Sequence, residues 1–131
     1  TELNYGKKRA SKWKVALFTD NKNKVINIRN IKDHSTIFSE YPNITRKALR
    51  KIDKKALIYF SYGSTEANVP KDYDYGVCVV VTNKTLEANN LKIIETFGTF
   101  SSVLIANPKS LKSSSKNKAI NYLLRKLIKN K

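Results

Sequence analysis

The clearest hydrophobic segment of the chain lies beyond its midpoint. Residues 76–82, with the sequence GVCVVVT, form an apolar run that predicts a strand buried on both faces of a sheet. Residues 13–19 and 24–29 are two further apolar segments, separated by the sequence DNKN, whose residues favour turns. We therefore predict that these two segments form a β-hairpin. Another strand is predicted at residues 55–62.

Three segments have the apolar periodicity of amphipathic helices. They run from about residue 44 to 52, from 85 to 97 and from 119 to 128. Gly98 follows the second segment directly, where a glycine commonly ends a helix. A strand is predicted next, over residues 100–106. The central strand, the second helix and this strand have the spacing of a parallel βαβ unit.

The order of the predicted elements is ββαββαβα. It predicts one α/β or α+β domain with a mixed sheet of about five strands, made of the N-terminal hairpin plus the βαβ unit, and about three helices. We expect residues 1–12 to be a flexible basic arm and residues 13–131 to be a single domain, because 131 residues is a common domain size. The segment 34–41 is ambiguous, and residues 107–118 are expected to form a polar loop.

The charge of the chain suggests a class of partner. Twenty-six Lys and Arg residues stand against ten Asp and Glu residues, which gives a formal net charge of +16. The 21 Lys, 14 Asn and 12 Ile residues against 5 Arg are typical of an AT-rich genome, which favours an origin in a virus, plasmid or other mobile element. Codon bias inflates the lysine count but does not explain the shortage of acids. We therefore expect polyanionic partners.

The positive charge is concentrated in the N-terminal arm, in residues 46–55 and in the segment from Thr96 to the end, which holds eight Lys and Arg residues and no acid. Clustered cations bind nucleic acid by releasing its counterions. We predict a non-enzymatic DNA- or RNA-binding protein that contacts the phosphate backbone, with residues 13–131 as the nucleic-acid-binding domain. The predicted contacts are Lys7, Lys8, Arg9, Lys12, Lys14, Arg46, Lys47, Arg50, Lys51, Lys54, Lys55, Lys112, Lys116, Lys118, Arg125, Lys126 and Lys129.

Aromatic residues are interleaved with these basic segments. Trp13, Tyr59 and Tyr62 are predicted to stack on bases, as aromatic side chains do in proteins that bind single strands. Phe60 lies on the same face of its predicted strand as Ala56, and we expect it to pack in the core.

Two alternative functions remain open. The first is a peripheral membrane or assembly protein whose basic faces bind anionic lipid. The second is a small metal-dependent nuclease that uses Asp72 and Asp74, with Glu66 nearby. No catalytic residue, metal ligand or cofactor is predicted for the main interpretation, since the four scattered glycines form no phosphate-binding loop and Cys78 and His34 are expected to be structural.

The remaining expectations concern location and assembly. A single cysteine and the lack of a visible signal peptide predict an intracellular protein, in the cytoplasm or in the nucleoid or nucleus. The longest apolar run is far shorter than the ~20 residues that cross a bilayer. The apolar stripe of the C-terminal helix also makes a homo-oligomer possible. No motif in the sequence identifies a family.

Overall fold

The computed structural model describes residues 2–3 and 12–129 and the side chains of residues 12–127. The chain forms two compact units. One consists of residues 13–99, and the other combines the N-terminal residues up to Lys12 with residues 100–131. The assignment of residues 13–131 to a single domain stays a prediction. No helix in the described part of the chain is long and apolar enough to cross a membrane.

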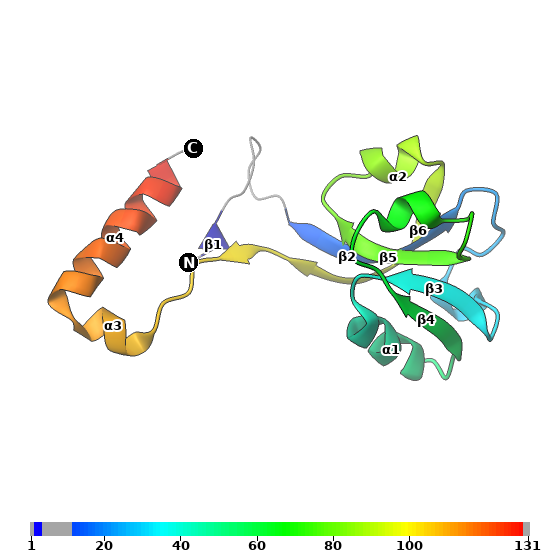
Figure 1. Ribbon diagram of the computed structural model, residues 1–131, viewed down its shortest axis with the longest axis horizontal. Helices are drawn as coiled ribbons and strands as arrows, with labels where there is room; N and C mark the ends of the chain where they lie inside the picture. The colour runs from blue at the N-terminus through cyan, green and yellow to red at the C-terminus, as the bar shows by residue number, and fades with distance from the viewer. Residues whose placement is uncertain (1, 4–11, 130–131) are drawn as a thin grey trace. The chain divides into compact units, whose positions relative to one another are not determined.

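The larger unit is built on a mixed five-stranded sheet with the strand order β4-β3-β5-β2-β6 (Figure 1). Strand β3 is parallel to both β4 and β5, whereas β2 is antiparallel to β5. This arrangement confirms the predicted α/β class and the mixed sheet of five strands. The strands are β2 (Trp13–Asp20), β3 (Ser35–Ser39), β4 (Ala56–Phe60), β5 (Tyr75–Val80) and β6 (Leu91–Phe100).

Short helices connect these strands. They are the 3-10 helix η1 (Ile28–Asn30), α1 (Pro42–Arg50), the 3-10 helix η2 (Thr65–Asn68) and α2 (Lys84–Ala88). The other unit contains β1 (Glu2–Leu3), β7 (Ser102–Val103), α3 (Pro108–Lys112) and α4 (Ser114–Lys129). In it, β1 pairs with β7 in antiparallel register. The described residues thus form four α-helices, one more than predicted.

The sheet carries a hydrophobic core on each face. Val15 and Leu17 of β2 belong to the core that includes Leu49 of α1. Ala16 and Phe18 point to the opposite face, in the core that includes Leu86 of α2. The alternation along β2 therefore covers both faces of the sheet, with α1 on one side and α2 on the other.

Gly76 of β5 is required by the close approach of Phe18. A Cβ atom at residue 76 would lie 2.3 Å from Cζ and 2.4 Å from Cε2 of the Phe18 ring. The ring is fully buried and cannot move into solvent. No side chain larger than that of glycine fits here without displacing the ring.

The predicted N-terminal hairpin is wrong. Residues 24–29 form no strand, and β2 pairs with β5 instead. The Asn23 side chain accepts a hydrogen bond from the backbone N–H of Val25, and the Asn27 side chain accepts one from the N–H of Arg29, where η1 begins. These local bonds occupy backbone groups that a strand would use for its ladder.

The predicted helix over residues 85–97 is also wrong beyond its first turn. Helix α2 ends at Ala88, Asn90 has a left-handed φ of 56°, and β6 begins at Leu91. Ile93 and Ile94 are β-branched residues, which favour a strand over a helix. The predicted strand over 100–106 consists only of the end of β6 and of β7, and the predicted polar loop over 107–118 is mostly helical.

The parallel βαβ unit lies elsewhere than predicted. Strand β2 separates β5 from β6, so these two strands are not neighbours. The actual unit is β3-α1-β4, in which Ser35 pairs with Ala56 and Ser39 pairs with Phe60. The ambiguous segment 34–41 therefore contains a central strand of the sheet.

Candidate functional site

Three parallel strands end at one edge of the sheet. Strand β3 lies between β4 and β5, and the carboxyl ends of all three strands are on the same side. The chain passes from β3 to β4 on one side and then crosses to β5 on the other side. Open α/β sheets bind ligands outside the carboxyl ends of their strands at such a reversal of strand order. We therefore look for the functional site at this carboxyl edge.

A buried hydrogen-bond network holds a carboxylate at this edge. The Thr65 hydroxyl donates to Oε1 of Glu40 over 3.0 Å. Oγ of Ser61 lies 2.8 Å from Oγ1 of Thr65. The Ser61 hydroxyl also donates to the Gly63 carbonyl over 3.2 Å, and either hydroxyl of the Ser61–Thr65 pair can act as its donor. Ser61 and Thr65 are buried and Glu40 is half-buried, so the network fixes Glu40 directly after β3.

A second hydroxyl pair fixes the connection from β3 to α1. Oγ of Ser39 accepts a hydrogen bond from the backbone N–H of Tyr41 over 3.0 Å. The Thr45 hydroxyl donates to the Tyr41 carbonyl over 3.0 Å, so the Ser39 hydroxyl donates to Oγ1 of Thr45 over 2.9 Å. Ser39 and Thr45 are both fully buried. The turn that carries Glu40 is thus rigidly held from both sides.

A small cavity lies beside the end of β5. It has a volume of about 150 Å³ and is lined by Glu66, Cys78, Val79, Val80, Val81, Thr82, Thr85 and Leu86. Thr82 and Thr85 are exposed, and Asn83 and Lys84 between them are exposed as well. The cavity brings Glu66 of η2 next to the loop that follows β5.

Cys78 lines this cavity as a neutral thiol. Burial, together with the smaller effect of the nearby carboxylates of Glu40 and Glu66, raises the pKa of Cys78 to about 12. The thiolate, which is the nucleophilic form, is therefore not populated near neutral pH. The expected structural role of Cys78 agrees with this environment.

The carboxyl edge combines two kinds of chemistry. Thr82, Lys84 and Thr85 offer exposed hydroxyl and ammonium donors, which suit phosphate oxygens. Glu40 and Glu66 offer carboxylates, which suit the hydroxyl groups of a ligand or a developing positive charge. Of these residues only Glu66 was considered from the sequence, as a neighbour of Asp72 and Asp74 in the nuclease alternative. Their position after the parallel strands is the signal that would have identified them. That signal can be used only if β3 is first recognised as a strand.

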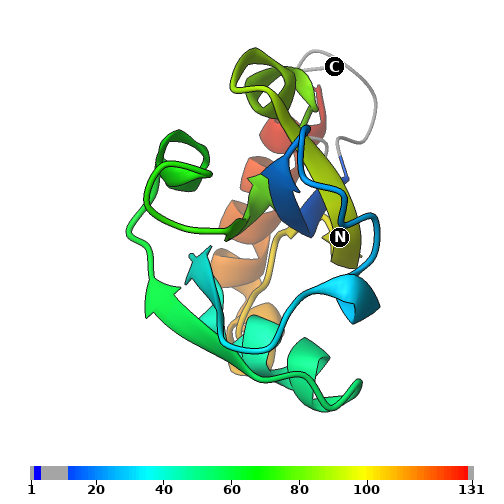
Figure 2. The ribbon, with the colours of Figure 1, turned by 90° about the vertical axis from the view of Figure 1, so that its right-hand side faces the viewer.

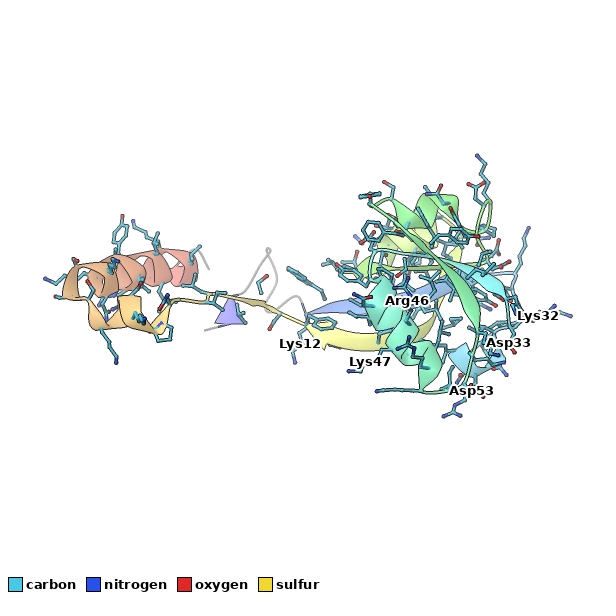
Figure 3. The ribbon with its side chains drawn as sticks, turned by 60° about the horizontal axis from the view of Figure 1, so that its bottom comes forward. Lys12, Lys32, Asp33, Arg46, Lys47 and Asp53 are labelled. Atoms are coloured by element: carbon cyan, nitrogen blue, oxygen red, sulfur yellow. The ribbon has the colours of Figure 1, made fainter. Side chains whose placement is uncertain are left out.

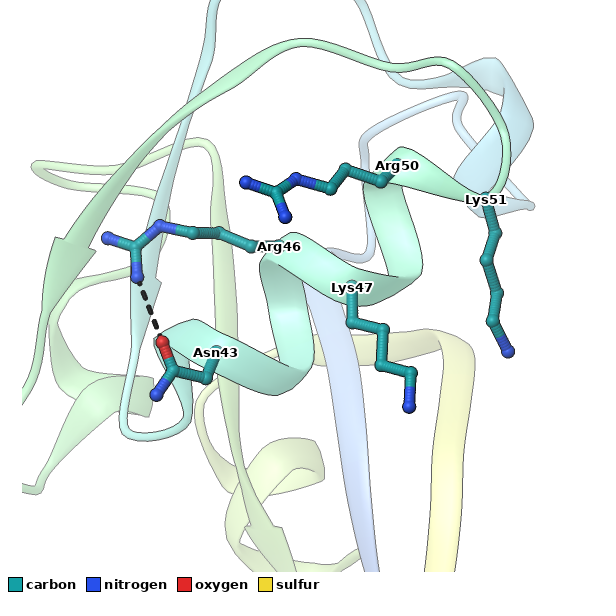
Figure 4. A pocket seen from close by; sticks show the side chains of 5 residues that line it. All are labelled: Asn43, Arg46, Lys47, Arg50 and Lys51. Carbon is teal, nitrogen blue, oxygen red and sulfur yellow. Dashed lines mark hydrogen bonds between the residues drawn. The ribbon is translucent and has the colours of Figure 1, made fainter.

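The cationic helix face is found where it was predicted. Arg46, Lys47 and Arg50 are exposed on α1, opposite the buried Leu49 (Figure 3). Together with Asn43 and Lys51 they line an open pocket of about 550 Å³, where Nη1 of Arg46 donates to Oδ1 of Asn43 over 3.2 Å (Figure 4). Lys54 and Lys55 line a second pocket beside Arg46 and Arg50.

The other predicted basic contacts are distributed over both units. Lys12 is exposed and Lys14 is half-buried at the start of β2. The predicted contacts that are exposed on α3 and α4 are Lys112, Lys116, Lys118, Arg125 and Lys126, and Nζ of Lys126 lies 5.6 Å from the centre of the Tyr122 ring. Lys7, Lys8 and Arg9, and the side chain of Lys129, lie outside the described residues.

The aromatic residues predicted to stack on bases differ in their environments. Tyr62 is 96% exposed and makes an edge contact with Phe60, whereas Tyr59 packs at a tilt on Tyr73. Trp13 is half-buried. Phe60 is 52% exposed, so its predicted place in the core is wrong, because β4 is the edge strand of the sheet.

The acidic pair considered for a metal has a structural contact. Oδ2 of Asp74 accepts hydrogen bonds from the backbone N–H and the hydroxyl of Thr36, both over 2.8 Å. This contact ties the start of β5 to β3, at the edge opposite the carboxyl ends. Within residues 12–127, no three His, Cys, Asp or Glu side chains are grouped to hold a metal ion.

Comparison with protein families matches residues 1–129 to the family of ATP phosphoribosyltransferase, HisG. A relative of that name from Methanocaldococcus jannaschii is 32% identical over 112 residues, which are 85% of this chain and 39% of the relative. Another from Thermodesulfovibrio yellowstonii is 34% identical over 121 residues, 89% of this chain and 40% of the relative. The chain thus spans about two fifths of the length of these relatives.

Solved structures with a similar fold include an ATP phosphoribosyl transferase (HisG:HisZ) complex from Thermotoga maritima. The TM-score is 0.72 at 20% identity, and the match covers all of this chain and 64% of that one. A substrate-binding domain of a putative amino acid ABC transporter from Streptococcus pneumoniae has a TM-score of 0.55 at 12% identity, over 98% of this chain and 62% of that one. These identities support a shared fold only.

These matches contradict the predicted function. The relatives are named for a transferase activity, so the prediction of a non-enzymatic nucleic-acid-binding protein from a virus, plasmid or mobile element is wrong. The two alternatives, a protein that binds anionic lipid and a metal-dependent nuclease, are wrong for the same reason. Nucleic acid as the partner is also wrong, since the family is that of a transferase. A basic composition does not distinguish a nucleic-acid binder from an enzyme that handles small phosphorylated ligands.

Proposed function

Because the chain belongs to the ATP phosphoribosyltransferase family, we propose that it forms part of an enzyme that transfers a phosphoribosyl group to ATP. The observation that carries this proposal is the family match over residues 1–129. Since the chain spans about two fifths of its relatives, we assign it one part of the active site. ATP is an intracellular metabolite, which fits the predicted intracellular location.

The carboxyl edge of the sheet is the proposed place of binding. Both ligands of such a reaction carry phosphate groups, and the segment from the end of β5 into the first turn of α2 presents Thr82, Lys84 and Thr85 to solvent. The net charge of +16 attracts such anions from a distance. The cations that first suggested nucleic acid thus gain a role in concentrating small anionic substrates.

The carboxylates of this edge have a proposed role in the transfer itself. In the reaction a nucleophilic atom of ATP forms a bond to C1 of the ribose, and the bond from C1 to the leaving group breaks. Positive charge develops on C1 and the ring oxygen as the bond from C1 to the leaving group breaks. A preorganised carboxylate nearby stabilises that charge. Glu40, held by Thr65, and Glu66, at the cavity, are the candidates.

Ligand binding tests the proposal on the chain itself. ATP and phosphoribosyl diphosphate, as the phosphoribosyl donor, would each be titrated calorimetrically, and diphosphate release would be followed with both present. We expect Lys84→Gln to weaken binding of at least one ligand by about tenfold or more, because it removes a charge-assisted hydrogen bond to phosphate.

Lys126→Gln on α4 is the matched control. It makes the same change in net charge at an exposed lysine of the other unit. The proposal predicts at most about a twofold effect in this control, since it alters only the long-range attraction. Equal affinity in the parent chain and in Lys84→Gln, or an equal loss in both variants, would contradict the placement of the site.

A further inference from the structure

Strand β4 is an open edge of the sheet. It pairs with β3 on one side and has no partner strand on the other among the described residues (Figure 2). An edge strand presents unpaired backbone donors and acceptors that another extended chain can use. Natural proteins usually protect such edges with charged side chains or proline. Here Leu57, Tyr59 and Phe60 are 45–52% exposed on β4.

The hydrogen bonds of β4 show which backbone groups are open. The N–H of Ser61 donates to the Ser39 carbonyl, and the carbonyl of Lys55 accepts from the N–H of His34. Odd-numbered residues therefore direct their backbone groups toward β3. Because the direction alternates along a strand, the N–H and C=O groups of Ala56, Ile58 and Phe60 point outward.

The two faces beside this edge differ in character. On one face, a groove of about 290 Å³ runs between α1 and β4, with Leu49, Ala56 and Ile58 as its apolar part and four cations around it: Arg46, Arg50, Lys54 and Lys55. On the other face lie the exposed side chains of Leu57 and Tyr59. A strand added to β4 would therefore have one row of side chains beside cations and the other beside apolar groups.

We propose that β4 and the cationic groove bind an extended acidic segment of a partner protein, which adds to the sheet as a sixth strand. The backbone bonds to Ala56, Ile58 and Phe60 supply the pairing. Acidic side chains at alternate positions meet Arg46 and Arg50, and apolar side chains between them cover Leu57 and Tyr59. This surface runs along β4 and reaches the carboxyl edge only at Phe60, and it does not depend on the function proposed there.

Charge complementarity selects this occupant over a second copy of the chain. Two copies paired through β4 about a two-fold axis would place the same four cations opposite one another, and like charges across such a pair are destabilising. The C-terminal segment of the chain is an equally poor occupant, because it has eight cations and no acid from Thr96 onward. An acidic partner neutralises the groove instead.

A synthetic peptide that alternates glutamate with valine is the probe. Backbone pairing makes little demand on sequence, so this peptide satisfies the proposed requirements. We expect it to bind the full chain and to slow amide hydrogen exchange at Ala56, Ile58 and Phe60. A peptide with lysine in place of glutamate should not bind. Unchanged exchange at these three amides with the acidic peptide at millimolar concentration would overturn the proposal.

Peptide variants test the strand geometry without altering the protein. N-methylation of either all glutamates or all valines removes the donors along one edge of the peptide. One of the two methylated peptides should bind at least about tenfold more weakly, because it loses several hydrogen bonds to β4, and the other should bind nearly as before. Equal binding of both would exclude strand addition.

Protein variants test the charge. Arg46→Gln with Arg50→Gln removes two positive charges from the groove, and Lys116→Gln with Lys126→Gln makes the same change in α4. We expect the first pair to weaken peptide binding by about tenfold and the second by less than about twofold. If both pairs weaken binding equally, the attraction is a property of net charge, and the proposed surface is wrong.

Discussion

Removal of one buried hydroxyl tests the network at the carboxyl edge. Thr65→Val replaces the side chain that donates to Glu40 and is hydrogen-bonded to the Ser61 hydroxyl with one of nearly the same shape. Hydrogen bonds to charged groups contribute about 1.5–3 kcal/mol, and the site is fully buried at Thr65. One kcal/mol corresponds to about 4–8 °C in a unit of this size. We therefore expect the melting temperature to fall by roughly 10 °C.

A double-mutant cycle with Glu40→Ala identifies the cause of that loss. Thermal unfolding would be followed by circular dichroism in the parent chain, both single variants and the double variant. If the Thr65–Glu40 bond is the source, Thr65→Val should cost less than about 1 kcal/mol once Glu40 is gone. Thr65→Ser, which keeps the hydroxyl, is the control and should retain most of the stability. The same cost of Thr65→Val with and without Glu40 would refute the proposed coupling.

Two further predictions concern the core of the larger unit. Gly76→Ala should destabilise it by about 1–3 kcal/mol in chemical unfolding, because the added Cβ would lie 2.3 Å from the Phe18 ring. Phe18→Leu in the same chain should recover part of that loss. If the free-energy costs of the two substitutions simply add, no clash between residue 76 and the Phe18 ring is present. Cys78 should react with a thiol reagent at pH 8 only upon unfolding, since its pKa is raised to about 12. Its proton stays bound in the folded state while an unfolded thiol loses it, so stability should decline as the pH rises from about 9 towards 12, and Cys78→Ala should flatten that decline. Rapid reaction of Cys78 in the folded chain would contradict its burial.

Strong local patterns predicted part of the fold. The apolar run of β5 predicts a buried strand, and the apolar stripe of α1 predicts an amphipathic helix. The apolar residues at consecutive positions of β2 predict that both faces of this strand are covered. The segment containing β6 was wrongly predicted as a helix, because Leu91 and Ile94 have the spacing of a helix and are also the buried residues of a strand. The left-handed Asn90 that separates α2 from β6 carries no unambiguous signal in the sequence.

The candidate site was the harder part to predict. The cationic residues of α1 were found because charge and periodicity coincide in a single helix. The contact of Glu40 with Thr65 and the position of Glu66 beside Thr82 depend on the parallel pairing of β3 with β4 and β5. That pairing depends on contacts between segments far apart in the chain, which no local pattern encodes. The net charge suggests anionic ligands as a class, and the prediction of nucleic acid failed because charge alone does not distinguish a polymer from a small phosphorylated molecule.

Mapping of ligand contacts by nuclear magnetic resonance tests the central claim most directly. ATP and phosphoribosyl diphosphate would be added separately to the ¹⁵N-labelled chain, and the backbone amide shifts followed residue by residue. The account predicts that the largest shifts lie after the three parallel strands, at residues 40–45, 61–66 and 81–86. Shifts confined to residues 46–50 of α1 or to α4, with these three segments unchanged for both ligands, would contradict it.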